Sequence, residues 1–334
     1  MTVRIAGTGS YLPARVVAND EIVSQLESTT EWIFSHTGIV SRHVAAPEES
    51  AATMGAAAAR AALSAAGADP ADIGLVILTT TTPDYSNYPS TACLVQAELG
   101  CVNAAAFDLA AACSGFVYGL ETAKCFLLAH PGRKALVIGS EVLSRHIDWT
   151  DRSNAMLFGD GAGAVVVEAV PGEAPRFVRS LLGADGAGAA LIRREGGARR
   201  FPTADPVHAP AGPEGMTYLQ MDGHAVFTFA VRKLAEILDA LCRESGVGPE
   251  ALDLVFAHQA NARILDAVAR RMKLPSERFY SNLKTVGNTS SASIPLCLDR
   301  AVREGMLKDG MRIALAGFGS GLTWAGSLAE WPYV

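Results

Sequence analysis

Cys113 is the residue in this chain best placed to act as a nucleophile. It lies in "DLAAACSGF", residues 108–116, where the strand-like run "AAAFDL" gives way to the helical pattern "CSGFVYGLETAKCFLLA". The first turn of a helix has unpaired N–H groups and carries about half a positive charge, which favours thiolate over thiol. We therefore expect a lowered pKa and covalent catalysis by Cys113. The alternative is a free cysteine that serves only as a small buried hydrophobe.

Two polar residues further along the chain are candidate partners for this thiol. His258 follows the strand-like run "LDLVFA", and functional groups of α/β sheets gather at the carboxyl ends of strands. Asn288 lies in "VGNTSSAS", just before another helical pattern. Taken alone, His258 is as consistent with a core histidine, and Asn288 with a turn or cap residue.

The chain contains one pattern twice, and this suggests how the three residues could meet. Residues 67–78, "GADPADIGLVIL", match residues 246–257, "GVGPEALDLVFA", at an offset of 179 positions. The same offset aligns "KALVIGS" with "IALAGFG" and Cys113 with Ala292, at the start of the corresponding helix. We expect two similar α/β halves, 1–171 and 215–334, joined by an irregular insert at 172–214. If the halves pack with pseudo-twofold symmetry, the ends that carry Cys113, His258 and Asn288 converge.

Composition limits the classes of function. The chain has 334 residues, 49% of them hydrophobic and 19% charged, which is typical of a globular protein with a large core. Its net charge of −6 provides no global basic field for nucleic acid, and no apolar run reaches the roughly 18 residues of a membrane span. We expect no signal peptide, because "MTVRIAGTGSYLP" lacks a charged start followed by a long apolar run. Apolar strands such as "LVILTT" indicate sheets covered by helices on both faces.

The cysteines and glycines argue against metal and nucleotide sites. The six cysteines form no CxxC pair, so we expect no zinc, and their scatter indicates free thiols in a cytoplasmic, reducing compartment. The glycines of "GFGSGLTW" precede a strand pattern, where a dinucleotide loop requires a helix. Such a turn can instead offer backbone N–H groups to an oxyanion.

At this point the motifs carry a resemblance that covers nearly the whole chain. The marks, in order, are "EWIFSHTGI", "YPSTAC", "DLAAACSGF", "TDRSNAMLFGDGAGA", "MDGHAVF", "AHQAN", "VGNTSSAS" and "GFGSGLTW". Together they resemble the β-ketoacyl-acyl-carrier-protein synthase III family, the condensing enzymes that start type II fatty acid synthesis. The resemblance implies a duplicated thiolase-like α/β fold with five αβαβα layers, and a homodimer.

The resemblance also implies a two-stage acyl transfer. Cys113 takes the acyl group from an acyl-CoA, and His258 and Asn288 stabilise the enolate formed when malonyl-carrier protein loses CO2. The product is a 3-oxoacyl-carrier protein, and no metal or redox cofactor takes part. Backbone N–H groups of Cys113 and Ser320 form the oxyanion hole, although Ser320 replaces a glycine usual in the family.

Binding residues carry over by their place in the motifs. Trp32 and Arg152 match the pair that holds the CoA adenine, whereas His36 stands where an arginine is usual. Tyr88 stands where relatives often have phenylalanine, at the end of an acyl pocket that the dimer partner supplies. The pantetheine channel corresponds to Gly223, Phe227, Ala260 and Asn261. Carrier-protein docking corresponds to Arg263, with Arg270 on the same helix face.

Three alternatives stand beside fatty acid initiation. The first is a relative with the same Cys-His-Asn set that primes polyketides, transfers acyl groups to hydroxyls or builds quinolone precursors; a thiolase is disfavoured, because Asn288 stands where its second catalytic cysteine would be. The second is a cysteine hydrolase, which the decarboxylation of malonyl-carrier protein would distinguish from a condensing enzyme. The third is a catalytically inactive binding protein, which the presence of all three polar residues in their family contexts argues against.

Overall fold

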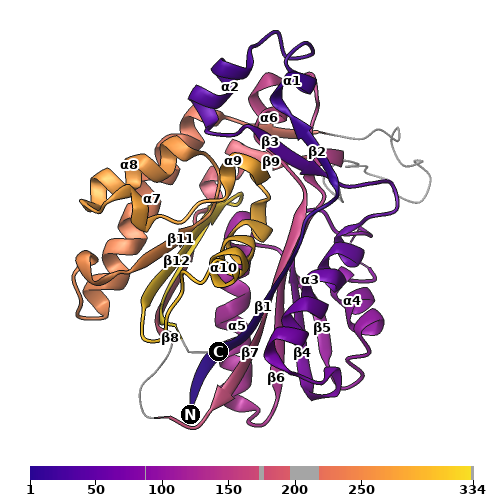
Figure 1. Ribbon diagram of the computed structural model, residues 1–334, viewed down its shortest axis with the longest axis vertical. Helices are drawn as coiled ribbons and strands as arrows, with labels where there is room; N and C mark the ends of the chain where they lie inside the picture. The colour runs from indigo at the N-terminus through magenta and orange to yellow at the C-terminus, as the bar shows by residue number, and fades with distance from the viewer. Residues whose placement is uncertain (87, 173–176, 196–217, 332–334) are drawn as a thin grey trace, which may run out of the picture.

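The computed structural model describes residues 1–334 except 87, 173–176, 196–217 and 332–334. Two sheets run side by side through the molecule, with helices outside and between them (Figure 1). Among the described residues, no helix has the length and apolar character needed to cross a bilayer.

The first sheet belongs to the N-terminal part of the chain. Strand β4 is parallel to both neighbours, β5 and β6, and β7 runs antiparallel to β6 and β1. Every residue of β4 is buried, because helices cover both faces of the sheet. The strand order is β1 (Thr2–Tyr11), β7 (Gly161–Val170), β6 (Lys134–Glu141), β4 (Ile73–Thr79) and β5 (Ala105–Leu109).

The second sheet repeats this arrangement with four strands. β11 is parallel to β12, and β13 runs antiparallel to β12 and β8. The strand order is β11 (Leu254–Ala257), β12 (Arg312–Gly319), β13 (Thr323–Glu330) and β8 (Phe177–Ala184). The predicted irregular insert, 172–214, therefore contains a regular strand, β8, that belongs to this sheet. Residues 173–176 and 196–214 of that insert lie outside the described residues.

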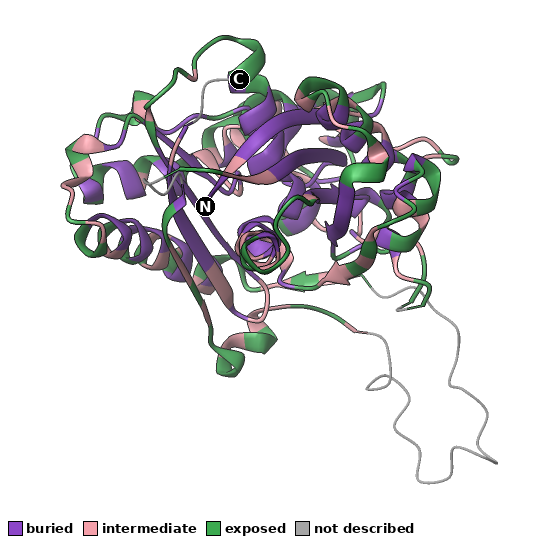
Figure 2. Ribbon diagram, turned by 90° about the horizontal axis from the view of Figure 1, so that it is seen from below, coloured by how far each residue is buried: buried purple, intermediate pink, exposed green. Residues whose placement is uncertain are grey.

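Three helical layers enclose the two sheets, which gives the five-layer αβαβα order that the family resemblance implies. α5 (Gly115–Ala129) and α10 (Ser293–Arg303) lie between the sheets in one shared core. α3 (Ala51–Ala66) and α4 (Thr91–Leu99) cover the outer face of the first sheet. α7 (Gly223–Glu244) and α8 (Ala262–Met272) cover that of the second. Figure 2 shows the resulting buried strands and the exposed outer helix faces.

Short elements complete the chain. α1, α2, β2, β3 and α6 lie together at the top of Figure 1. Their bounds are β2 (Arg15–Ala18), α1 (Asn19–Ile22), α2 (Thr30–Thr37), β3 (Ser41–Val44), α6 (Arg152–Ala155), β9 (Ile192–Arg194), β10 (Leu219–Met221) and α9 (Leu283–Val286).

A tight 3-10 turn precedes each of the two central helices. The turn η2 (Ala112–Ser114) leads into α5, and η8 (Ser290–Ala292) leads into α10. Ala112 and Ser290 have similar positive φ angles, 47° and 48°. The equivalent turns are therefore 178 positions apart, so Ser291 corresponds to Cys113 and the predicted match with Ala292 is displaced by one residue.

Each turn packs against a strand of the other half at a glycine. A Cβ atom on Gly319 of β12 would lie 2.6 Å from the backbone nitrogen of Cys113. A Cβ atom on Gly139 of β6 would lie 2.4 Å from the carbonyl oxygen of Ser291. Because neither distance leaves room for a side chain, glycine at these two positions allows the halves to cross closely.

We expect Gly139→Ala to destabilise the protein by about 1–3 kcal/mol, since the added methyl overpacks a contact between two backbone segments. Gly186→Ala is the matched control, because its added Cβ meets no atom within 4 Å. Urea unfolding followed by circular dichroism measures both. Equal unfolding midpoints for the two variants would contradict the close contact at Gly139.

Candidate active site

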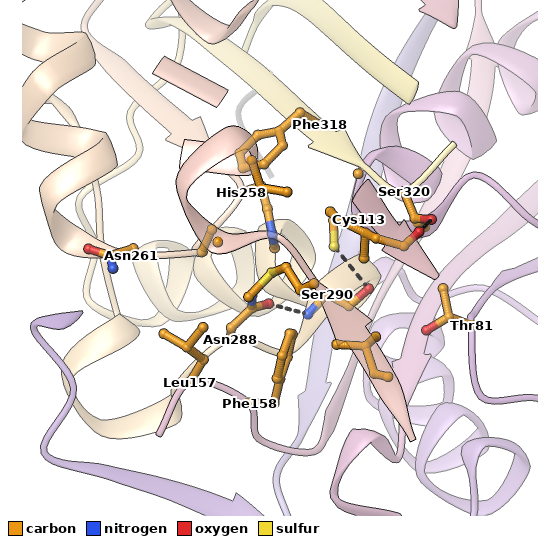
Figure 3. Close-up of a pocket in the computed structure, with 18 of the residues that line it drawn as sticks. Thr81, Cys113, Leu157, Phe158, His258, Asn261, Asn288, Ser290, Phe318 and Ser320 are labelled. Atoms are coloured by element: carbon orange, nitrogen blue, oxygen red, sulfur yellow. Dashed lines mark hydrogen bonds between the residues drawn. The ribbon is translucent and has the colours of Figure 1, made fainter. Parts of the chain in front are cut away.

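A single cavity of about 340 Å³ brings together residues from both halves. Cys113, His258 and Asn288 all line it, together with Ser320. In Figure 3 the first three side chains point toward the same space. The three residues that the sequence singled out for chemistry therefore share one site.

Cys113 lies at the centre of η2, two residues before α5 begins. Its Sγ–H donates to the Ser290 hydroxyl oxygen at 3.2 Å. Burial raises the pKa of the thiol to about 12; the nearby Glu141 carboxylate also raises it, and the Ser290 hydrogen bond lowers it. The expectation of a lowered pKa was wrong, because loss of hydration outweighs the field of the helix. The resting nucleophile is a protonated thiol.

His258 follows β11, and its backbone N–H donates to the Ala316 carbonyl of β12 at 2.8 Å. The residue is 1% exposed, and its ring meets the edge of Phe318 with 5.4 Å between ring centroids. Ring atom Nδ1 is 2.7 Å from the Ser293 hydroxyl. Burial lowers the pKa of the imidazole to about 3, so the ring is neutral at physiological pH.

Asn288 is fixed on both its backbone and its side chain. Its N–H donates to Leu157 and its carbonyl accepts from Gly159, which joins it to the segment around Phe158. Its Oδ1 accepts the backbone N–H of Ser290 at 2.9 Å. Because the oxygen faces a donor, the NH2 group is left for the cavity.

Ser320 lies beside η2 at the end of β12. The Thr323 hydroxyl contacts the carbonyl oxygens of Ala111, at 2.9 Å, and of Ser320, at 3.0 Å. This side chain ties together the two backbone segments for which sequence analysis predicts an oxyanion hole. The Ser320 hydroxyl donates away from them, to the Ile192 carbonyl.

The predicted pantetheine residues line the same cavity, whereas the predicted adenine pair lies outside its lining. Gly223, Phe227, Ala260 and Asn261 are lining residues. The Arg152 guanidinium carbon is 4.8 Å from the Trp32 ring centroid. His36 stacks on Trp32 with 4.0 Å between ring centroids, and its carbonyl accepts from Asn261 Nδ2 at 2.9 Å.

The predicted docking and acyl-pocket residues lie on the surface. Arg263 and Arg270 are exposed on one face of α8, and the Arg263 guanidinium is 5.9 Å from the Phe227 ring centroid. Tyr88 is 85% exposed and is not part of the cavity lining of its own chain.

Several site residues escaped the sequence analysis. They are side chains that contact the predicted three or line the cavity beside them: Thr81, Ser290, Ser293 and Phe318. The run "SSAS" after Asn288 is the only sequence signal for the serines, and nothing in it says which hydroxyl faces the thiol.

Both family models that match this chain describe one family. The family model described as 3-oxoacyl-[acyl-carrier-protein (ACP)] synthase III C terminal matches residues 242–331, and the 3-oxoacyl-[acyl-carrier-protein (ACP)] synthase III model matches residues 107–186. A beta-ketoacyl-[acyl-carrier-protein] synthase III of Bordetella petrii is 45% identical over 332 residues, which cover 98% of this chain and 97% of that protein.

Solved structures have the same fold. The 3-oxoacyl-(acyl carrier protein) synthase III of Pseudomonas aeruginosa superimposes with a TM-score of 0.89 at 39% identity, over 100% of this chain and 99% of that one. The priming β-ketosynthase of a polyketide biosynthetic pathway superimposes with a TM-score of 0.90 at 38% identity, over 99% and 96%. These matches span the chain from end to end and include both halves of the cavity. The chain belongs to the β-ketoacyl-[acyl-carrier-protein] synthase III family.

Proposed function

We propose that the chain catalyses the decarboxylative Claisen condensation of an acyl-CoA with malonyl-acyl-carrier protein and so initiates type II fatty acid synthesis. The observation that carries the proposal is the convergence of a thiol, a neutral imidazole and a carboxamide in one mostly apolar cavity. The reaction needs only these groups and the two substrates.

In the first stage, Cys113 attacks the thioester carbon of acyl-CoA. The carbon–sulfur bond to CoA breaks, the acyl group stays on Sγ, and the thiol proton leaves on CoA. The backbone N–H groups of Cys113 and Ser320 donate to the carbonyl oxygen while it carries negative charge. Thr323 supports this role, because it fixes the Ala111 and Ser320 carbonyls on either side.

In the second stage, malonyl-carrier protein loses CO2 and leaves an enolate that attacks the acyl-enzyme. Ser293 Oγ accepts a hydrogen bond from the backbone N–H of Gln259, with 3.4 Å between nitrogen and oxygen. The Ser293 hydroxyl therefore donates its own hydrogen to Nδ1 of His258. That contact leaves the ring hydrogen on Nε2, where it donates to the enolate oxygen. The Asn288 NH2 group supplies a second donor. The carbon–carbon bond forms as the bond from the acyl carbon to Cys113 Sγ breaks. The thiolate then takes up a proton from solvent, and 3-oxoacyl-carrier protein is released.

The substrates bind through the residues that the family resemblance identifies. Trp32 and Arg152 hold the adenine of CoA, with His36 supporting Trp32 from its stacked position. The pantetheine arm passes Gly223, Phe227, Ala260 and Asn261 to reach the thiol. Arg263 and Arg270 form a local basic face that attracts an acidic carrier protein, although the whole chain has a net charge of −6.

The protein is proposed to act as a homodimer in the cytoplasm. β5 is an edge strand of the first sheet, and apolar side chains near it are exposed: Phe107 by 38%, Val102 by 76% and Tyr88 by 85%. An exposed edge of this kind pairs readily with a second strand. In a dimer joined there, Tyr88 reaches the partner's acyl pocket. All six cysteines are free, as expected in a reducing compartment.

We expect Cys113→Ala to abolish acyl-enzyme formation, because no other cysteine lines the cavity among the described residues. Incubation with a panel of acyl-CoAs followed by mass spectrometry of the intact protein measures the bound acyl group and, in wild type, identifies the preferred primer. Cys125→Ala, at an exposed cysteine, is the control and should label normally. Normal acyl labelling of Cys113→Ala would refute the nucleophile.

We expect His258→Ala to form the acyl-enzyme but to lose condensation by about a hundredfold or more, since an oxyanion donor is removed. The assay follows 14CO2 release from malonyl-carrier protein and 3-oxoacyl product. His130→Ala, at an exposed histidine, should match wild type. Undiminished condensation in His258→Ala would overturn the enolate role.

We expect the wild-type chain to sediment as a dimer and Phe107→Asp to sediment as a monomer, because two carboxylates would meet at the paired edge. Tyr88→Ala should remain a dimer but accept longer acyl-CoAs. A dimeric Phe107→Asp variant would place the interface on another surface.

A further inference from the structure

Glu141 is a buried carboxylate that the proposed reaction does not use. It is the last residue of β6 and is 0% exposed. Its hydrogen bonds in the described part of the chain come from neutral hydroxyl and backbone N–H groups, whereas buried carboxylates are usually paired with a cation. The donors are Thr80 Oγ1 at 3.2 Å, Thr81 N at 3.0 Å, Thr81 Oγ1 at 2.9 Å, Thr82 Oγ1 at 2.9 Å, Ser291 Oγ at 2.8 Å and Ser291 N at 3.4 Å.

These donors come from two segments, each of which contributes one residue to the lining of the active site, Thr81 and Ser290. Thr80, Thr81 and Thr82 follow β4 of the first half, and Thr81 lines the cavity. Ser291 belongs to η8 of the second half, next to Ser290. Ser290 in turn accepts the Cys113 thiol at 3.2 Å through its hydroxyl and donates to Asn288 at 2.9 Å through its backbone. Glu141 is thus connected through Ser291 and its neighbour Ser290 to both the nucleophile, Cys113, and the enolate donor, Asn288.

We propose that Glu141 is a positioning residue, whose carboxylate joins the threonine segment to η8 so that Ser290 and Asn288 keep their places beside Cys113. The catalytic consequence of this inference rests on the proposed function, whereas the hydrogen bonds that join the two segments do not depend on it. η8 approaches β6 closely only because Gly139 lacks a side chain. Glu141, two residues further along β6, then fastens the turn at that distance.

The negative charge of Glu141 has a second effect on the thiol. It adds to burial in raising the pKa of Cys113. The other titratable residues that line the cavity are His146, Arg193, Arg194 and His258. Burial lowers the pKa of both histidines, so neither contributes a positive charge that opposes the carboxylate. Replacement of the carboxylate by an amide removes this repulsion and should lower the thiol pKa, whereas a purely structural role predicts no change.

Asp299 provides a matched control for the loss of a buried carboxylate. It is 2% exposed and accepts hydroxyl hydrogen bonds from Thr8 at 2.8 Å and Ser10 at 2.5 Å. It lies on α10 beside β1 rather than at the cavity, and Arg303 forms an ion pair with it at 2.9 Å. Asp299→Asn therefore reports what a buried carboxylate contributes to stability alone.

The experiment compares wild type, Glu141→Gln, Ser291→Ala and Asp299→Asn in the full-length protein. Iodoacetamide labelling of Cys113 between pH 6 and 10, read by peptide mass spectrometry, needs no substrate and so does not depend on the proposed function. We expect Glu141→Gln to react about threefold or more faster than wild type at a given pH below the thiol pKa. Ser291→Ala, which retains the charge, and Asp299→Asn should follow the wild-type pH profile.

The kcat of condensation, measured separately from the KM for acyl-CoA, tests whether Glu141 positions the reacting groups. Glu141→Gln and Ser291→Ala should lower kcat by about tenfold while acyl-CoA KM changes less than twofold, because the arrangement of reacting groups is disturbed and the CoA site is not. Asp299→Asn should retain wild-type kcat.

An unchanged labelling profile in Glu141→Gln together with unchanged kcat in both site variants overturns the inference. A loss of kcat in Asp299→Asn equal to that in Glu141→Gln overturns it as well. If Glu141→Gln does not fold, the kcat of Ser291→Ala decides alone. Absence of condensation in wild type would instead refute the proposed function and leave the labelling result standing.

Discussion

The close crossing of the two halves at a pair of glycines is the constraint on which the site depends. η2 of the first half packs against β12 at Gly319, and η8 of the second packs against β6 at Gly139. These contacts put the carboxyl ends of both sheets at one place, and the cavity forms between them. A side chain at either glycine would separate the halves, and the thiol would lose the groups that face it. The duplication therefore produces a site that neither copy could make alone.

Exclusion of water then sets the chemical state of the groups in the cavity. The same burial that keeps His258 neutral keeps Cys113 protonated. A neutral imidazole and a carboxamide donate hydrogen bonds to a developing oxyanion without transferring a full proton to it, so the enolate remains a carbon nucleophile. The groups that orient these side chains are neutral serine hydroxyls and backbone N–H groups rather than charged residues. An apolar cavity with few, fixed polar atoms is thus suited to carbon–carbon bond formation.

The strand-to-helix junctions that carry Cys113, His258 and Asn288 are local patterns, so the sequence was sufficient to mark these three residues as candidates. The internal repeat indicated that the junctions meet, and the family resemblance supplied the fold and the choice of these three side chains over their alternative roles. The roles of Ser290 and Glu141 could not be predicted, since they depend on contacts between segments more than a hundred residues apart. The pKa of Cys113 was predicted in the wrong direction, because the helix is visible in the sequence and the depth of burial is not. β8 was missed because its partner β13 lies at the far end of the chain.

The contact between Arg152 and Trp32 has a consequence for how a nucleotide is held. The guanidinium already rests against the indole, and His36 stacks on the same residue. Under the proposed function, an adenine that enters between Trp32 and Arg152 would exchange one π contact for others, so its net gain in free energy would be only the difference between them. The nucleotide end of the acyl donor would then add selectivity with little residence time, which favours release of CoA after acyl transfer.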